Sequence, residues 1–545
     1  MSDPRRSPEG ASASAARVSW IVTCARSPPC RLWRLPGGSS VPITTVTSAT
    51  LVGIDGHPIT VEVHLSNGLP SFTLVGLADG AAREARDRVR SAILSSGFEW
   101  PQRRLTVNLA PSDLRKGGSA LDLAVAVGVL AVTEQVPADA AGSWAYLGEL
   151  GLDGRIRTVG GLVPLAHCLA DVDLVVPAGG WQVAALVHGA AQIEGAGHLA
   201  EVVAALDGRT AWPAPPAPRP SSQRVAEPDM ADVTGQPLAR LACEVAAAGG
   251  HHLLMLGPPG AGKTMLARRV PGLLPDLDAT AALETSLVHS AFGRDLEDGL
   301  VRRPPLRSPH HSSSLVSLVG GGTAGLRPGE ISMAHNGVLF LDEMGEFAPQ
   351  VLEALRQPLE DGVISVSRVA GTCRYPARFL LVAAMNPCPC GEAGKPGGCR
   401  CSPAARARYA RRLSGPLLDR FDLRVMVARP EPDQLLGAAS GESTASVAAR
   451  VRMARDRCRD RGVACTAALD DRSLDEVSRL TDGARALLRD GLRSGVLSAR
   501  GVSRIRRVAL TLADLDDDEP VVDAERVAVA MTLRVDPARL LDAVG

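Results

Sequence analysis

The chain is 545 residues long and carries 59 Lys+Arg against 59 Asp+Glu, so its formal net charge is zero. This balance excludes a protein that is basic throughout, and any nucleic-acid site must be local. Hydrophobic residues make up 45% of the chain, but 55 Gly and 40 Pro divide them into runs too short for a membrane span or a signal-peptide core. We therefore expect a cytoplasmic protein without membrane contact.

The N-terminal third predicts a mixed α/β unit behind an unstructured extension. Residues 1 to 45 are rich in Ser, Arg and Pro without apolar periodicity, which predicts disorder. Over residues 46 to 210 the pattern changes to alternating strands and amphipathic helices, with strands expected in ITVEVHLS and RLTVNLA and a helix from Ala81 to Ser96. The Pro-rich segment from 211 to 230 is stiff and polar, and we expect it to be a linker.

The central region, residues 231 to 430, has the pattern of a parallel sheet. A helix is expected from Leu238 to Ala248, followed by the apolar strand HHLLML, a Gly-rich turn and another helix. Further buried strands are expected at Val338–Leu341 and Phe379–Met385. After residue 430 strands disappear and Ala/Arg/Leu helical patterns continue, so residues 431 to 545 predict an α-helical lid. The whole chain is therefore expected to be an α/β protein.

A phosphate-binding loop lies between the first central strand and the helix that follows it. The segment GPPGAGKT matches GxxxxGK[ST] in the strand–loop–helix context that the motif requires. Its glycines let backbone N–H groups surround phosphates, Lys263 is expected to reach the β- and γ-phosphates, and Thr264 is expected to ligate Mg²⁺. An accidental Gly-rich turn is disfavoured because the chain has only three lysines. The predicted ATP-binding residues are Gly257, Pro258, Pro259, Gly260, Ala261, Gly262, Lys263 and Thr264.

Polar side chains follow the next two apolar strands. The strand in GVLFLDEM ends in Asp342 and Glu343, about 80 residues after the loop. We expect Asp342 to contribute to the Mg²⁺ site and Glu343 to polarise the attacking water. Asn386 ends the strand FLLVAAMN and could orient the same water. In an open α/β sheet these strand ends meet at the edge where ligands bind.

Several motifs together carry a family resemblance. The segments GPPGAGKT, GVLFLDE, LVAAMNPCPCG, SGPLLDRFDL, RSPHHSSSLVSLVGGG, LRPGEISMAHNG and VLEALRQPLEDG resemble the ComM/YifB family of magnesium-chelatase-like AAA+ ATPases over about residues 46 to 545. The resemblance implies a Lon-protease-like, S5-like α+β domain at the N-terminus, a P-loop AAA+ αβα sandwich and a C-terminal α-helical lid.

The same resemblance implies roles for Asn386 and for three more residues. Asn386 is similar to sensor 1, Arg420 to an arginine finger that acts on a neighbouring subunit, and Arg500 to the sensor 2 arginine, with Arg504 as its competitor. A finger supplied by a neighbour implies a closed homo-oligomeric ring, expected to be a hexamer. The alternative for Arg420 is an ordinary salt bridge with Asp419 or Asp422.

Four cysteines follow Asn386 within a short loop. Cys388, Cys390, Cys399 and Cys401 form the pattern C-x-C-x₈-C-x-C. Four thiolates can close a tetrahedral structural Zn²⁺ site. Because C-x-C is less usual than C-x₂-C, reduced thiols or a redox-sensitive pair remain an alternative.

The N-terminal unit resembles the proteolytic domain of Lon through LRKGGSALDLAVA and GELGLDGRIRTVGGLVPL. Ser119 falls at the position of that family's nucleophile, but Val163 replaces the lysine that would activate it, so we expect no protease activity. Lys116 predicts either a phosphate or backbone contact or an ordinary solvated surface position.

DNA contacts are expected from arginines near the pore of the implied ring. The segment ISVSRVAGTCRYPA predicts a β-hairpin with Arg368 and Arg374 flanking its turn, and arginine contacts to phosphate need no base specificity. The block ARARYARRL adds further arginines and Tyr409 as a stacking candidate, with a solvated helix face as the alternative. His310 and His311 could line the nucleotide or pore region, but the sequence assigns them no role there and favours a structural hydrogen-bonding pair.

Three function hypotheses follow. The resemblance favours an ATP- and Mg²⁺-dependent ring motor on single- or double-stranded DNA, a helicase or branch-migration factor in homologous recombination and natural transformation. The first alternative is a chelatase-type ATPase subunit that remodels a protein partner for metal insertion. The second is a protein unfoldase or adaptor without DNA contact, but no aromatic pore loop supports it.

Overall fold

The computed structural model describes residues 43–535 except 115, 118, 218–226, 295, 297–298, 322–326, 369–370, 394–397, 413, 432–440 and 518, and only the backbone of Arg368 and Gly371. Residues 1–42 and the end of the chain after 535 therefore lie outside the described residues. No helix within this described portion is both long and apolar enough to cross a membrane.

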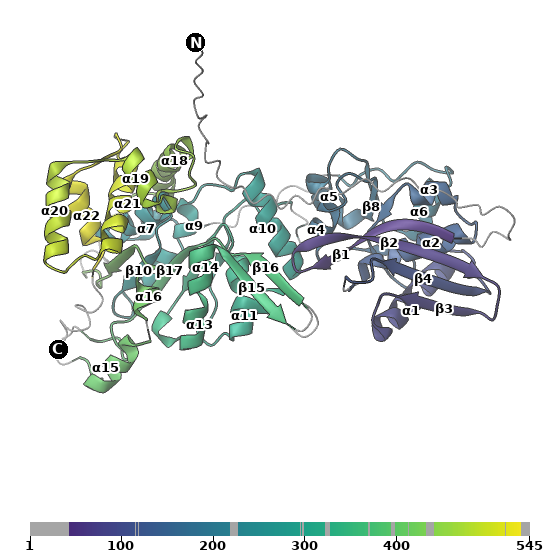
Figure 1. The fold of residues 1–545 in the computed structure, drawn as a ribbon, viewed down its shortest axis with the longest axis horizontal. Coiled ribbons are helices and arrows are strands. Elements are labelled where there is room, and N and C mark those ends of the chain that lie inside the picture. The colour runs from purple at the N-terminus through teal and green to yellow at the C-terminus, as the bar shows by residue number, and fades with distance from the viewer. Residues whose placement is uncertain are drawn as a thin grey trace, which may run out of the picture. The chain divides into compact units, whose positions relative to one another are not determined.

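The N-terminal part is built on a seven-stranded mixed sheet (Figure 1). Long antiparallel strands alternate buried and partly buried residues, as expected for a sheet with one face on a core. The strand order is β3 (Ser71–Val75), β4 (Arg104–Ala110), β2 (Asp55–Ser66), β1 (Ile43–Val52), β5 (Ala145–Tyr146), β8 (Leu174–Pro177) and β9 (Ile193–Ala196). The helices are α1 (Asp79–Ser95), α2 (Asp122–Val132), α3 (Ala138–Gly142), α4 (Leu162–His167), α5 (Trp181–Val187) and α6 (Leu199–Leu206).

The first strand begins earlier than the sequence pattern indicates. Ile43 already pairs with His64, so the extension expected over residues 1 to 45 is too long at its C-terminal end. The alternation is difficult to recognise in the sequence because Thr44 and Ser48, both polar, occupy buried positions of this strand. Ser48 tolerates burial because its hydroxyl donates to the backbone carbonyl of Tyr146 at 2.7 Å.

The central part contains the expected parallel sheet. Its order is β11 (Leu306–Arg307), β14 (Val338–Leu341), β17 (Leu380–Met385), β10 (Leu253–Leu256) and β18 (Leu423–Met426). Strand β10 is short, apolar and buried on both faces, with Leu253 and Met255 in one core and Leu254 and Leu256 in another. Helices on the two faces therefore make the αβα arrangement that was expected.

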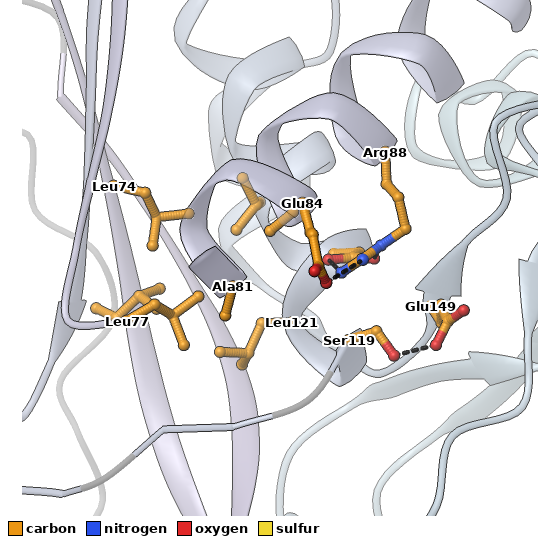
Figure 2. A pocket seen from close by; sticks show the side chains of 12 residues that line it. Leu74, Leu77, Ala81, Glu84, Arg88, Ser119, Leu121 and Glu149 are labelled. Atoms are coloured by element: carbon orange, nitrogen blue, oxygen red, sulfur yellow. Dashed lines mark hydrogen bonds and ion pairs between the residues drawn. The ribbon is translucent and has the colours of Figure 1, made fainter. Parts of the chain in front are cut away.

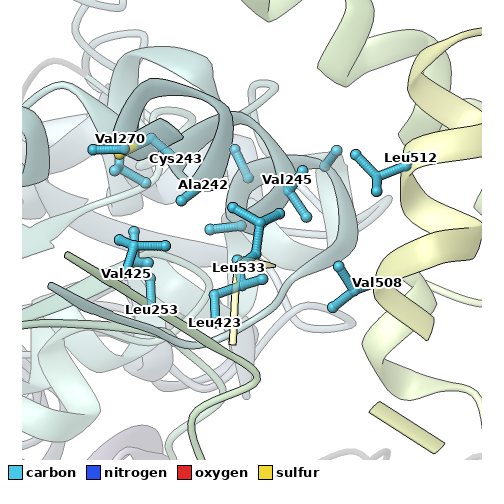
Figure 3. Packing of buried hydrophobic residues seen from close by; sticks show 14 of the residues in the cluster. Ala242, Cys243, Val245, Leu253, Val270, Leu423, Val425, Val508, Leu512 and Leu533 are labelled. Carbon is cyan, nitrogen blue, oxygen red and sulfur yellow. The ribbon is translucent and has the colours of Figure 1, made fainter. Parts of the chain in front are cut away.

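Helix α7 (Pro237–Gly249) joins this sheet to the C-terminal helices. Figure 3 shows Ala242 and Val245 of α7 between the strand residues Leu253 and Leu423 on one side and Val508 on the other. The helical region is confirmed, but one two-residue parallel strand pair, β19 (Arg479–Leu480) with β20 (Val521–Val522), interrupts it. Its helices are α18 (Thr444–Asp460), α19 (Asp471–Val477), α20 (Asp482–Arg493), α21 (Ala499–Leu515) and α22 (Ala524–Thr532).

The hairpin expected before the Asn386 strand is also present. Strands β15 (Val363–Arg368) and β16 (Gly371–Pro376) pair antiparallel, with Arg368 opposite Gly371. One face of the hairpin packs Ile364, Val366 and Tyr375 into the core, so the described part of both strands is held against the sheet.

Candidate nucleotide-binding site

Three strand ends form the candidate site. Strands β10, β14 and β17 are parallel and in register, with Leu254 opposite Ala383 and Leu341 also opposite Ala383. The phosphate-binding loop follows β10, Asp342 follows β14 and Asn386 follows β17, so all three segments leave the sheet at one edge. Gly260 and Gly262 take positive φ of 77° and 92°, a conformation that side chains rarely adopt.

The lysine of the loop lies at the centre of this edge. Lys263 Nζ donates to the carbonyls of Gly257 at 2.6 Å and Pro258 at 2.9 Å, and to Asn386 Oδ1 at 3.1 Å. Burial lowers the pKa of Lys263, while the nearby carboxylates of Asp342 and Glu343 oppose that shift. The structure therefore brings together Lys263 and Asn386, which are 123 residues apart in the chain.

Two oxygen ligands lie where a magnesium ion would fit. Thr264 Oγ1 donates to Asp342 Oδ2 at 2.8 Å. Neighbouring ligands of an octahedral Mg²⁺ at about 2.1 Å would be about 3.0 Å apart, so this hydroxyl and carboxylate have the chemistry and the spacing to share one ion.

Glu343 lies at the rim of the same edge in a strained backbone conformation. Its φ is 51°, and its backbone N–H donates to Asp342 Oδ1 at 3.0 Å. The side chain is 53% exposed, and its Oε2 lies 3.5 Å from His311 Nδ1. A left-handed residue after a buried strand turns the carboxylate out of the sheet toward the solvent edge, where a water would be accessible.

The histidine pair contributes to this rim, which was the less favoured of the two interpretations of the sequence. The rings of His310 and His311 lie 4.1 Å apart, and His310 Nδ1 contacts Ser312 Oγ at 2.7 Å. His311 faces both Glu343 and, edge-on at 6.5 Å, Phe347. The signal available in the sequence was the PHH segment, but nothing in its spacing pointed to Glu343.

A cavity of about 430 Å³ is lined by Gly235 and Pro237, the two neighbours of Gln236. The side chain of Gln236 reaches toward the loop, donating to Ala428 O and, at 3.5 Å, to Ala261 O. The residues lining the cavity are Met230, Gly235, Pro237, Arg240, Leu241, Glu244, Glu442 and Val447. This cavity could not be predicted from the sequence because its walls come from segments about 200 residues apart.

Arg420 lies at the ends of the parallel strands opposite those that carry the phosphate-binding loop. It precedes β18, which pairs in register with β10 so that Leu253 faces Leu423 and Leu256 faces Met426. The strand between Arg420 and the phosphate-binding edge spans about 10 Å, before the turns at both ends are added. Arg420 is bonded to Glu360, with Nη2 and Oε2 2.5 Å apart, rather than to the two aspartates considered from the sequence.

Those aspartates have other partners. Asp419 lies 3.7 Å from Arg424, and Asp422 contacts Arg504 at 3.5 Å and the buried His251 at 3.2 Å. Arg504 also donates to the carbonyl of Phe421, whereas Arg500, one turn earlier in α21, is exposed. The structure thus places Arg504 near Arg420 and does not bring it to Lys263 of the same chain.

The four cysteines come together as the sequence suggested. All four sulfurs lie within 4.8 Å of one another, a group that could hold a metal ion. Burial raises the pKa of Cys388 to about 12, whereas N–H groups of Glu392 and Arg400 lower the pKa of Cys390 to about 6.

The side chain that faces Ser119 in the protease-like pocket is a carboxylate, whereas the Lon resemblance requires an amine. Figure 2 shows Ser119 directed toward Glu149, to which its hydroxyl donates. Arg88 and Asp122 line the same pocket and form an ion pair of 2.6 Å. Val163 is buried elsewhere, in α4. Lys116 is only 6% exposed and donates to the carbonyls of Pro111 and Leu114, so it makes the backbone contact and is not a solvated surface residue.

The structure describes one of the two candidate DNA-binding arginines in full. Arg374 is exposed on β16, and the side chain of Arg368 lies outside the described residues. Tyr409 is 3% exposed and packs against Gly345, so the stacking role considered for it is wrong. Its helix, α15 (Pro403–Ala410), turns this ring inward, while Arg408 and Arg411 stay exposed.

Comparison with known proteins agrees with this architecture. Family models described as magnesium chelatase subunit ChlI match residues 229–435, subunit ChlI of Mg-chelatase residues 61–179, and the ChlI C-terminal region residues 441–534. The chain is 42% identical to the uncharacterized protein YifB of Escherichia coli over 90% of this chain and 97% of that protein. It is 41% identical to the competence protein ComM of Haemophilus influenzae over 88% of this chain and 95% of the relative.

The resemblance of the N-terminal region to Lon is also found. Lon protease 2 of Bacillus subtilis is 30% identical over 161 residues, which is 26% of this chain and 27% of that protein. Matches of more than 40% identity across nearly the whole length, together with the P-loop edge of the parallel sheet, identify the family. The chain belongs to the YifB/ComM family of magnesium-chelatase-like AAA ATPases.

Proposed function

We propose that the chain hydrolyses ATP at the P-loop edge and does so as a subunit of a ring, expected to be a hexamer. Lys263 would bind the β- and γ-phosphates, exchanging the loop carbonyls for phosphate oxygens. Thr264 and Asp342 would hold Mg²⁺, which neutralises phosphate charge when bound. The cavity lined by Gly235 and Pro237, the neighbours of Gln236, would take the nucleoside end of ATP.

The water that attacks the γ-phosphate would be handled by two side chains. Glu343 accepts its proton, because the carboxylate is exposed at the rim beside Asp342. Asn386, already within hydrogen-bonding distance of Lys263, would orient the same water. His311 contacts Glu343 and would keep that carboxylate turned toward the site, which makes it a positioning residue.

The observation that carries the ring is the placement of Arg420. It lies at the sheet edge opposite its own phosphate-binding loop, and Glu360 holds it there. It could meet a γ-phosphate only if a neighbouring subunit presents its P-loop edge to this surface. Arg504 lies on the same side, so we expect it, rather than the exposed Arg500, to take the sensor 2 role across the same interface.

We further propose that the ring translocates on DNA, as a helicase or branch-migration factor in recombination and natural transformation. The name of the relative ComM, a competence protein, supports this direction. One face of the hairpin of β15 and β16 packs into the core, and Arg374 is exposed on the other face, which suits a contact with phosphates. The other candidate, a chelatase-type ATPase subunit acting on a protein partner, is favoured by the ChlI description of all three matching models.

ATP hydrolysis measured with and without DNA separates these two functions. We expect single- or double-stranded DNA to stimulate turnover, and the stimulation to weaken as salt is raised. Replacing Arg368 and Arg374 with Ala should remove the stimulation and leave basal turnover, whereas Arg489→Ala, an exposed arginine on α20, should behave as wild type. Branch migration of a four-way junction then tests the finer claim. Turnover indifferent to DNA would favour the chelatase-type function.

A further inference from the structure

The loop that carries the four cysteines rests directly on the phosphate-binding loop. Cys388 follows Asn386 by two residues, so one end of the cysteine loop is anchored beside Lys263. Gly391 has φ of 79°, and a Cβ there would lie 2.6 Å from Pro259 Cδ. Backbone of the cysteine loop therefore touches the P-loop itself, with no space for a side chain between them.

An arginine adds a second link between the same two loops. Arg429 Nη2 contacts Glu392 Oε1 at 3.0 Å, and Arg429 Nε donates to the carbonyl of Pro259 at 3.3 Å. Two contacts thus join Pro259 to the cysteine loop: the packing at Gly391 and the bridge through Arg429. If the cysteine loop lost its conformation, the phosphate-binding loop would lose both of these contacts.

The sulfur geometry fits one tetrahedral ion. Cys388 Sγ lies 3.3 Å from Cys390 Sγ and 3.7 Å from Cys399 Sγ, and the Cys390 and Cys399 sulfurs are also 3.7 Å apart. Four thiolates around Zn²⁺ at about 2.3 Å would be about 3.8 Å apart. Cys401 lies within the same group, so every coordination position is filled by protein and none is open for catalysis.

We propose that Zn²⁺ bound by Cys388, Cys390, Cys399 and Cys401 fixes the cysteine loop, and that this loop positions Pro259 and Asn386 for ATP binding. The ion would replace the thiol protons, which are released to solvent, and no residue changes its oxidation state. The sulfurs alone cannot order the loop, because four unbridged thiols make only weak hydrogen bonds to one another. The proposal rests on the P-loop being the ATP site of the proposed function.

The first experiment removes the ion from the full chain. Elemental analysis of protein purified under reducing conditions should find about one zinc per chain, and none in Cys399→Ser/Cys401→Ser. Removing zinc with a strong chelator should weaken binding of a fluorescent ATP analogue at least tenfold, and added Zn²⁺ should restore it. The matched control is Cys168→Ser, which changes a half-buried cysteine far in the sequence from the four ligands. It should keep both zinc and affinity for the ATP analogue.

The second experiment separates the contact from the metal. Gly391→Ala keeps all four thiols but inserts a methyl group against Pro259, so zinc should stay at one equivalent while ATP affinity falls at least tenfold. Arg429→Ala should also keep zinc and weaken ATP binding, and Arg429→Lys should recover part of the loss. These variants also serve if the cysteine variant fails to fold.

Distinct results would overturn the proposal and the ATP site. A zinc-free purified protein with full ATP affinity, a Cys388–Cys390 disulfide in its place, or unchanged affinity after zinc removal would refute the coupling. Lys263→Ala is the reference for the site itself. If that variant binds the ATP analogue as well as wild type, the assignment of the P-loop fails, whatever the zinc results show.

Discussion

Removing the intramolecular partner of Arg420 should raise ATP turnover. Arg420 is 27% exposed and is bonded to Glu360, which is 63% exposed, so the pair is a surface salt bridge. Such pairs contribute about 0.2–1 kcal/mol, which is the free energy that Arg420 gives up when it turns to a neighbouring subunit. Glu360→Gln removes that cost, so turnover of the assembled ring should rise by about 1.4-fold to 5-fold.

The assay for this prediction is phosphate release at saturating ATP and at protein concentrations where rings form. Glu353→Gln is the matched control, because Glu353 is 53% exposed and pairs with Arg356 on the neighbouring helical turn. The control should turn over ATP at the wild-type rate. If Glu360→Gln instead loses activity as severely as Arg420→Ala, then Glu360 supports the finger in its working position, and the competition reasoning is refuted.

Three other predictions concern single residues. Glu343→Gln should bind ATP normally but hydrolyse it at least about 10²-fold more slowly, measured by analogue binding beside phosphate release; normal hydrolysis would place the base elsewhere. Ser119→Ala should leave ATP turnover unchanged, and neither wild type nor this variant should cleave peptides, because Glu149 supplies no amine to activate the hydroxyl. A peptide cleaved only by wild type would contradict this. His289 is fully buried as the neutral ring, with its Nε2–H donating to Met333 O, and burial lowers its pKa to about 4. The pKa of a histidine in the unfolded chain is near 6.5, so between pH 6.5 and pH 4 the unfolded state binds more protons than the folded state. The free energy of unfolding should therefore fall by about 3 kcal/mol as the pH drops from above 6.5 to 4. Denaturant unfolding at several pH values should show that loss in wild type and a flatter profile in His289→Gln.

The strands and the phosphate-binding loop were predictable because the sequence patterns that indicate them span only a few neighbouring residues. A Lys after Gly-rich sequence and an Asp after a buried apolar run carry their chemistry within a few neighbours, and the structure joins Thr264 to Asp342 as that chemistry requires. Parallel pairing also brought Asn386 to Lys263, which follows from strand ends meeting at one edge. The order of the five strands, however, depends on long-range packing that no single segment encodes.

Partners from distant segments were not predictable. Glu360 lies 60 residues before Arg420, and Glu392 reaches Pro259 only through Arg429. Helical spacing put Arg500 and Arg504 on related positions, but only packing against Phe421 and Asp422 distinguishes the inward one. Lys116 was ambiguous for the same reason, since burial is a property of the fold and not of its neighbours.

The most direct test of the shared ATP site mixes two inactive variants. Arg420→Ala keeps an intact P-loop, and Lys263→Ala keeps an intact arginine on the opposite sheet edge. If Arg420 completes the site of a neighbouring subunit, each variant alone should lose hydrolysis by roughly 10³-fold or more, and mixed rings should recover part of it. Mixed rings that native mass measurement shows to form, but that stay as inactive as either variant alone, would contradict the shared site.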